Sequence, residues 1–234
     1  MSITLIGLDA DDTLWHNETI FRMTQARFAD LLKDHGDPAV IEEHLVTVER
    51  RNLAIYGYGA KGFTLSMMET ALELSEGRVP SKVLAEILAA GREMMAHPIE
   101  PLPGVEEALA VLADQARLIL ITKGDLFHQE QKLAASGLGR HFHGVEIVSE
   151  KTPECYTHAF RRHGGDVAQA VMAGNSVKSD VIPALTAGAW AALVPYPLVW
   201  RHEAADAPAD HPRYRELETL ADLPGWVAEI RAAA

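Results

Sequence analysis

The feature that most constrains the fold is a short apolar run that stops at a cluster of carboxylates near the N-terminus. Residues 3–8 form the run, and Asp9, Asp11, Asp12 and Thr13 follow within five positions. A short apolar run ended by polar residues is typical of a buried strand. Because open α/β sheets bind ligands at the carboxyl ends of their strands, we expect Asp9 and Asp11 to lie at an active site.

The crowding of these carboxylates requires a compensating group. Two close carboxylates repel each other, which favours a cation between them or a shared proton. A turn followed by a helix cap also uses Asp and Thr, but a cap needs only one such residue. We therefore favour a functional site. For Asp12 the alternative is a side chain that points away and caps the following turn.

Two stretches of different pattern follow this first strand. The segment after residue 17 has helical periodicity and no strand signal until about residue 95, which predicts a compact bundle of four helices. From about residue 97 onward, strand and helix patterns alternate, which predicts a parallel sheet with helices on both faces. The bundle helices are expected at residues 17–35, 37–56, 63–74 and 81–95, and the later strands at 117–121, 145–148, 170–173 and 189–194.

The first strand has to join this later sheet, because a lone strand cannot be buried. The predicted fold is therefore of the α/β class, a Rossmann-like parallel sheet with an inserted all-helical, four-helix domain. We expect the sheet domain to comprise residues 1–14 and 98–234, and the helical insert residues 15–97. A Pro-rich stretch after residue 97 is typical of a link between domains.

Composition excludes several classes of protein. The chain has 234 residues, a formal net charge of -12 and a sequence pI near 5.3, which argues against general binding to nucleic acid or anionic membrane. No apolar run approaches the roughly 20 residues of a membrane span, and the N-terminus lacks the pattern of a signal peptide. The single cysteine, Cys155, fits a reducing compartment. We expect a cytoplasmic protein without nucleic-acid or membrane partners, and its oligomeric state cannot be inferred.

Polar residues follow each later strand where it is predicted to end. A hydroxyl and a cation before a turn, at the end of the strand 117–121, form a plausible anion site. A lysine precedes a Thr-Pro pair that is typical of a helix start, and an amide and a carboxylate follow the strand 170–173. These residues are Thr122, Lys123, Lys151, Asn175 and Asp180.

In their order along the chain, these groups resemble the four motifs of the haloacid dehalogenase (HAD) superfamily of hydrolases. Asp9 to Thr13 is similar to its Asp-x-Asp-x-Thr motif, and Thr122 and Lys151 are similar to the second and third motifs. The segment from Gly174-Asn175 to Asp180 resembles the fourth motif. The helical insert stands where the family has its helical, C1-type cap.

The resemblance implies a Mg²⁺-dependent phosphatase. Asp9 would attack the phosphoryl group and form an aspartyl-phosphate, and Asp11 would protonate the leaving alcohol and later deprotonate water. Mg²⁺ would bind the Asp9 carboxylate, the Asp11 backbone carbonyl and the Asn175 side chain. Asp180 would orient the waters of the metal, or Lys151, from behind these ligands.

The same resemblance implies how the substrate is held. Thr122, Lys123 and Lys151 would bind the phosphoryl oxygens of a small phosphomonoester. Which phosphomonoester is bound cannot be inferred from the sequence. Where the family usually has a metal-binding aspartate this chain has Asn175, which contributes no charge, so weaker Mg²⁺ binding is expected.

Two other functions stay open at this point. A metal-independent 2-haloacid dehalogenase would use the same nucleophile, but such members lack the carboxylate that Asp11 provides. A non-catalytic phosphate-binding relative is suggested only by Asn175.

A Gly-rich segment at residues 57–62 matches G-x-G-x-x-G but follows a helix instead of a strand, so dinucleotide binding is rejected. It is expected to be a loop of the helical domain that helps to choose the substrate, or one that only packs. The candidate contacts of the cap with the substrate are Trp15, Tyr56, Tyr58 and Lys61.

Overall fold

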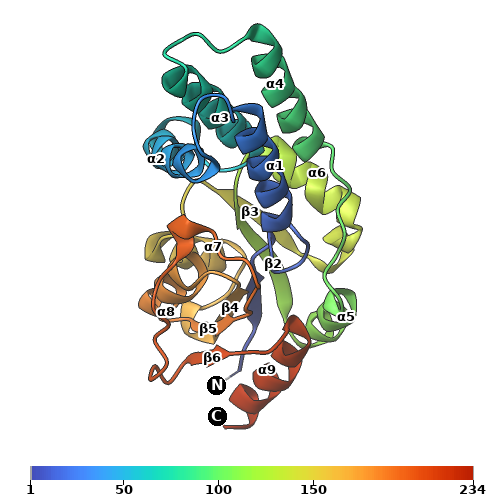
Figure 1. The fold of residues 1–234 in the computed structure, drawn as a ribbon. Coiled ribbons are helices and arrows are strands. Elements are labelled where there is room, and N and C mark those ends of the chain that lie inside the picture. Colours follow the sequence, from blue (N-terminus) through green and yellow to red (C-terminus); the bar gives the residue numbers. More distant parts are fainter. Residues whose placement is uncertain (1, 234) are drawn as a thin grey trace. The chain divides into compact units, whose positions relative to one another are not determined.

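The sheet of the protein is parallel and six-stranded in a computed structural model that describes residues 2–233 (Figure 1). The strand order is β3-β2-β1-β4-β5-β6. The predicted α/β fold is therefore confirmed. The strands are β1 (Leu5–Leu8), β2 (Arg117–Lys123), β3 (Gly144–Val148), β4 (Ala170–Gly174), β5 (Trp190–Leu193) and β6 (Tyr214–Glu216).

The N-terminal strand β1 lies between β2 and β4, and each of its residues is buried. Leu8 pairs with Leu120 of β2 on one side and with Ala173 of β4 on the other. The chain builds β2 and β3 to one side of β1, and then β4, β5 and β6 to the other. This reversal of direction makes the carboxyl ends of β1 and β4 the topological switch point, where such sheets bind their ligands.

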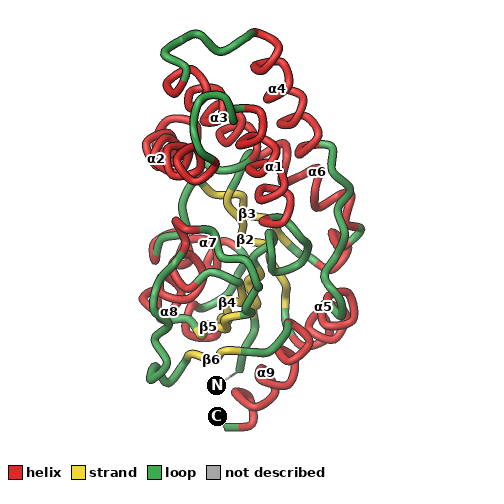
Figure 2. Tube along the Cα trace, in the orientation of Figure 1, coloured by secondary structure: helices red, strands yellow, loops and turns green. Residues whose placement is uncertain are grey.

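Helices cover both faces of the sheet. On one face, α5 (Val105–Gln115) and α9 (Leu223–Ala232) pack with alternate residues of β1 such as Ile6. On the other face, α7 (Pro153–Arg162) and α8 (Ile182–Ala187) pack against residues such as Leu5. Figure 2 shows these helices in red around the yellow strands.

The helical segment between β4 and β5 is divided in two. Residues Val177–Val181 form a π-helical turn, and α8 begins only at Ile182. Pro183 has no N–H to donate to the carbonyl of Ser179, which an α-helix would require at this position. The Tyr156 hydroxyl donates to the Ser179 oxygen instead, at 2.8 Å.

Residues after Glu18 form a helical unit with a core of its own, which includes Phe28, Ile41, Met67 and Ile87. The predicted four helices are present, although α1 ends earlier than expected and α3 starts earlier. They are α1 (Glu18–Leu31), α2 (Pro38–Tyr56), α3 (Ala60–Leu74) and α4 (Ser81–Met95).

The chain divides into two compact units. The helical unit comprises Thr19–Pro98 together with Gly124–His128, and the sheet unit comprises the rest of the described chain. The insert predicted from the sequence is 15–97. The main difference is segment 124–128, which includes the start of α6 (Leu126–Ser136) and belongs to the helical unit. Within residues 2–233, each helix is too short or too polar to cross a membrane.

Candidate active site

The carboxylate of Asp9 lies at the end of β1 against an ammonium group from the loop after β3. Lys151 Nζ donates to Asp9 Oδ1 at 2.5 Å and to Asp180 Oδ1 at 2.7 Å. Thr13 Oγ1 donates to Asp9 Oδ2 at 3.2 Å, and the backbone N–H of Ser176 donates to Asp180 Oδ2 at 3.0 Å. The structure thus brings together three predicted site residues that are far apart in the sequence, and all three are buried.

Burial raises the pKa of Asp9 to about 7, although the adjacent Lys151 ammonium works in the opposite direction. Burial by itself would lower the pKa of Lys151, but the carboxylates of Asp180 and Asp9 outweigh it and keep the lysine charged. One ammonium between two carboxylates leaves an excess negative charge in a buried place. A cation at Asp9 would remove that excess.

The Asn175 amide lies directly beside Asp9. One end of the amide is 3.3 Å from Asp9 Oδ2 and 3.3 Å from the Asp11 backbone oxygen. With nitrogen at that end, the amide donates hydrogen bonds to both oxygens. With oxygen there, three oxygens face one another, an arrangement that only a cation makes favourable.

This donor set fits Mg²⁺ when the Asn175 amide turns its oxygen toward Asp9 and the Asp11 carbonyl. Neighbouring ligands in an octahedron with bonds of about 2.1 Å are about 3 Å apart. The two distances of 3.3 Å from the Asn175 amide to Asp9 Oδ2 and to the Asp11 carbonyl oxygen are close to this spacing. Only one of the three is a carboxylate. Among the described residues, no group of three His, Cys, Asp or Glu side chains is arranged to hold a metal. Asp9, the Asp11 carbonyl and Asn175 would hold the ion, with waters completing its shell.

Three donors surround the side chain of Asp11. Lys132 Nζ donates to Oδ1 at 2.5 Å and the Trp15 indole N–H donates to the same oxygen at 2.7 Å. Gln129 Nε2 donates to Oδ2 at 3.2 Å. Asp11 remains 25% exposed at its side chain, whereas Lys132 is 7% exposed.

Gln129 also connects Asp11 to the predicted phosphate-binding hydroxyl. Its Nε2 lies 2.8 Å from Thr122 Oγ1 and 3.1 Å from the Lys123 carbonyl oxygen. The sequence reasoning missed Gln129 and Lys132. Both are polar residues on the buried face of an amphipathic helix, the face on which Leu133 packs against the core. Polar residues at apolar positions of a helical pattern are the sequence signal that indicates them.

The Lys123 ammonium pairs with Glu203 instead of Asp9. Its Nζ is 2.6 Å from Glu203 Oε1 and 2.9 Å from Ser179 Oγ. Ser176 and Ser179 both donate to Glu203 Oε2 at 2.5 Å. Despite burial, Lys123 and then these hydroxyls keep the pKa of Glu203 below its usual value. These contacts tie the Lys123 amine to Glu203, so the predicted role of Lys123 in binding phosphate stays a prediction.

A sequence model of haloacid dehalogenase-like hydrolases matches residues 3–188 of the chain, which includes all four motifs. The chain belongs to this family. No curated protein sequence matches it.

Solved structures of other HAD-like hydrolases agree with this assignment. A haloacid dehalogenase-like family hydrolase from Xanthomonas campestris is 43% identical, with a TM-score of 0.89 over 99% of this chain and 93% of that one. An L-2-haloacid dehalogenase from Xanthobacter autotrophicus is 16% identical (TM-score 0.65, covering 99% and 100%). A predicted phosphoglycolate phosphatase from Haemophilus somnus is 17% identical (TM-score 0.63, covering 97% and 98%). The last two share the fold alone.

In this HAD-like hydrolase Asp12 has a capping role. Its backbone is left-handed, with φ of 62°, and its carboxylate points away from Asp9 toward the next helix. Asp12 Oδ1 accepts the N–H groups of Asn17 at 2.8 Å and of Glu18 at 3.0 Å. Burial raises the pKa of Asp12 to about 7, against these hydrogen bonds. Asp12 therefore starts α1.

The four predicted cap contacts differ in position. Trp15 is completely buried in the core of the sheet unit, so its predicted contact with the substrate does not fit the structure. Tyr56 donates to Glu69 at 2.7 Å within the helical unit. Lys61 pairs with Asp125 at 2.8 Å, also within that unit. Tyr58 is half-buried in the loop between α2 and α3.

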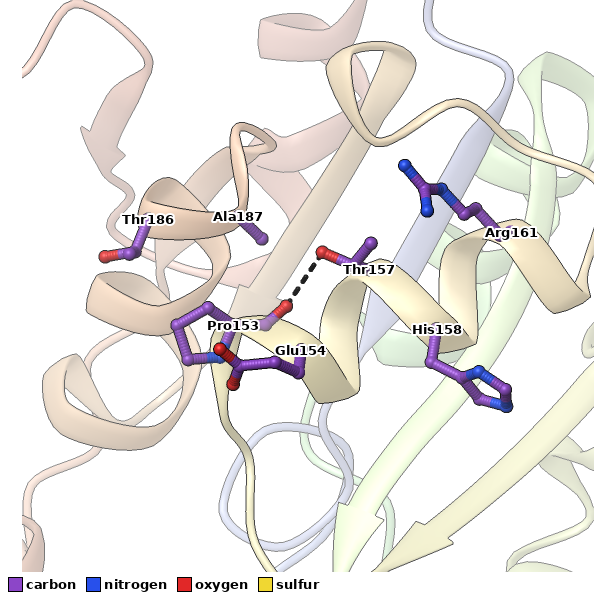
Figure 3. A pocket seen from close by; sticks show the side chains of 7 residues that line it. All are labelled: Pro153, Glu154, Thr157, His158, Arg161, Thr186 and Ala187. Atoms are coloured by element: carbon purple, nitrogen blue, oxygen red, sulfur yellow. Dashed lines mark hydrogen bonds between the residues drawn. The ribbon is translucent and has the colours of Figure 1, made fainter.

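A shallow surface pocket lies between α7 and α8 (Figure 3). Thr157 in this pocket donates to the carbonyl of Pro153 in its own helix, at 2.9 Å. The pocket contains none of the predicted site residues. The candidate active site of the HAD-like hydrolase therefore lies at the carboxyl ends of β1, β2, β3 and β4.

Proposed function

We propose that this HAD-like hydrolase is a Mg²⁺-dependent phosphatase that cleaves a small phosphomonoester through an aspartyl-phosphate intermediate. The observation that carries the proposal is the Asp11 carboxylate, partly exposed and two residues beyond the candidate nucleophile Asp9. A second carboxylate at this place supplies an acid and a base to ester hydrolysis. Removal of a halide needs no protonated leaving group, so it makes no use of this carboxylate.

In the first step an Asp9 oxygen attacks phosphorus while the bond from phosphorus to the ester oxygen breaks. Asp11 donates a proton to the departing oxygen, which leaves as an alcohol. In the second step water attacks phosphorus, Asp11 takes a proton from the water, and the bond to Asp9 breaks to release phosphate. Thr122 and Lys151 hold phosphoryl oxygens, and Mg²⁺ would supply positive charge between the two anions.

The charges of the site support an anionic substrate with a cation. Three carboxylates, those of Asp9, Asp11 and Asp180, contact two ammonium groups, those of Lys132 and Lys151. When all three carboxylates are ionised, the group carries one net negative charge, which would repel a phosphate. A divalent cation reverses the sign of this charge and so favours binding of the phosphoryl group.

A metal-independent dehalogenase is the second candidate, and the Asn175 amide is the observation that favours it. With its nitrogen directed at Asp9 and at the Asp11 carbonyl, the amide satisfies both oxygens without any cation. The two candidate functions therefore call for opposite orientations of the Asn175 amide.

Phosphate and halide release from the purified protein distinguish the two candidates. We expect hydrolysis of p-nitrophenyl phosphate or another phosphomonoester that requires Mg²⁺ and falls at least about 1,000-fold in the Asp9→Asn variant. Asp11→Asn should also lose activity, whereas a change at the exposed Gln131 should not. Metal-independent chloride release from 2-chloropropionate, without phosphate release from a broad panel of esters, would replace the phosphatase by the dehalogenase.

A further inference from the structure

The carboxylate of Asp11 is held by helix α6 in one defined orientation. Its Oδ1 accepts two hydrogen bonds, from Lys132 Nζ at 2.5 Å and from the Trp15 indole at 2.7 Å. Its Oδ2 accepts one, from Gln129 Nε2 at 3.2 Å. Because each carboxylate oxygen offers two lone pairs, Oδ1 is fully used and Oδ2 keeps one for a further partner.

We propose that Lys132 and Gln129 are positioning residues that direct Asp11 Oδ2 at the oxygen of the leaving group. The proposal rests on the proposed phosphatase function, in which Asp11 exchanges a proton with that oxygen. Lys132 holds the oxygen that does not react, and Gln129 sets the direction of the oxygen that does.

The geometry of α6 suits this role. Positions 129 and 132 are three residues apart, so both side chains project from one face of the helix. Lys132 also donates to Asn17 Oδ1 at 3.2 Å, which fixes its long side chain at a second point. Both residues are buried, whereas Asp11 is partly exposed. The side of Asp11 that faces Lys132 and Gln129 is therefore shielded from solvent, whereas its other side is accessible to a substrate.

Gln129 links the side chain of Asp11 to the predicted phosphate-binding hydroxyl of Thr122. The same Nε2 that contacts Asp11 Oδ2 contacts Thr122 Oγ1 at 2.8 Å, and Thr122 is the predicted phosphate-binding hydroxyl. A shift of α6 would move the acid and the phosphoryl site together. This matters because a misplacement of about 1 Å can reduce a rate by about 100-fold.

The rates of cleavage of two substrates of similar shape test whether Asp11 is correctly oriented. Nitrophenolate is a stable anion and leaves p-nitrophenyl phosphate with little protonation, whereas the phenolate of phenyl phosphate needs a well-placed acid. We expect Lys132→Met to reduce kcat at least about 10-fold more for phenyl phosphate than for p-nitrophenyl phosphate, with KM nearly unchanged. Lys132→Arg should recover most of this loss because it restores the donor.

Gln131→Met is the matched control, since Gln131 lies on the exposed face of the same helix and should leave both rates as in the wild type. Gln129→Leu tests the second residue and replaces Lys132→Met if that variant does not fold. Equal losses of kcat on the two esters, or no loss, would overturn the positioning role. A wild type that cleaves neither ester nor any other phosphomonoester would instead contradict the proposed function.

Discussion

At the scale of single residues, Asp12 makes the stability of the fold depend on pH. Its buried carboxylate caps α1, and its pKa is raised to about 7 from an ordinary value of 3.8. Between these two values the folded protein binds a proton that the unfolded chain has lost. The free energy of unfolding therefore falls as pH rises from about 4 to 7, and the penalty is complete above the folded pKa.

The Asp12→Asn variant should remove the part of this dependence that Asp12 contributes. Asn keeps an oxygen that can accept from Asn17 and Glu18, and it tolerates the left-handed backbone of position 12. We expect the variant to be about 1 to 3 kcal/mol more stable than the wild type at pH 8, and to approach it near pH 4. Urea unfolding at several pH values tests this. A wild type whose stability rises between pH 4 and 7 because of Asp12 would contradict it.

The second residue-scale prediction concerns Asn175. Replacing its amide by a carboxylate adds a charge 3.3 Å from Asp9 Oδ2. Without metal this charge is unfavourable, but with Mg²⁺ it supplies a second anionic ligand. We expect Asn175→Asp to bind Mg²⁺ about 10-fold more tightly by calorimetric titration. Gln131→Glu adds the same charge at an exposed position and should change little. Equal affinity in wild type and Asn175→Asp would argue against position 175 as a ligand.

At the scale of elements, the end of β4 and the turn after it are fitted to each other at Gly174. A Cβ at this position would lie 2.2 Å from Asp180 Oδ2, the oxygen that accepts the Ser176 N–H. Any side chain at position 174 therefore displaces Asp180, and with it the contact to Lys151. The glycine is required by this close approach of strand and turn.

Gly174→Ala should thus lower both stability and activity. We expect a loss of about 1 to 3 kcal/mol in the free energy of unfolding. We also expect kcat to fall at least about 10-fold, because Lys151 loses one of its two carboxylate partners. Gly225→Ala in α9 is the control, since its added Cβ would meet nothing within 4 Å. Unfolding and rate measurements on the two variants should diverge, and similar behaviour would refute the steric argument.

At the scale of the whole molecule, the division into two units makes ligand effects local. The candidate metal ligands belong to the sheet unit, and the helical unit has a separate core. An ion that binds only the folded site stabilises that site by mass action, by about 1.4 kcal/mol at ten times Kd.

Mg²⁺ should therefore raise the Tm of the protein by about 2 to 6 °C over a sample with chelator, at equal ionic strength. If calorimetry resolves two transitions, the Mg²⁺ shift should be confined to one, the unfolding of the sheet unit. The Asp9→Asn variant should lose most of the shift, because it lacks the only carboxylate ligand. An equal shift in this variant would mean that Mg²⁺ acts elsewhere on a chain of net charge -12.

Much of the fold was predictable because its signals are local. The helices Pro38–Tyr56 and Ser81–Met95 agree with the sequence prediction, since caps and apolar periodicity depend on near neighbours. The four groups of motif residues were also recognisable, because each follows a buried strand, and parallel strands bring their carboxyl ends to one edge of the sheet.

The partners of these residues were decided only by the tertiary structure. Lys132 meets Asp11 across 121 positions, and Lys123 meets Glu203 across 80. The sequence by itself determined that carboxylates, lysines and a hydroxyl would gather at one edge. Which lysine would contact which carboxylate depended on how α6 and the segment around Glu203 pack against that edge. Such contacts follow from the packing of whole elements, and no local pattern encodes them.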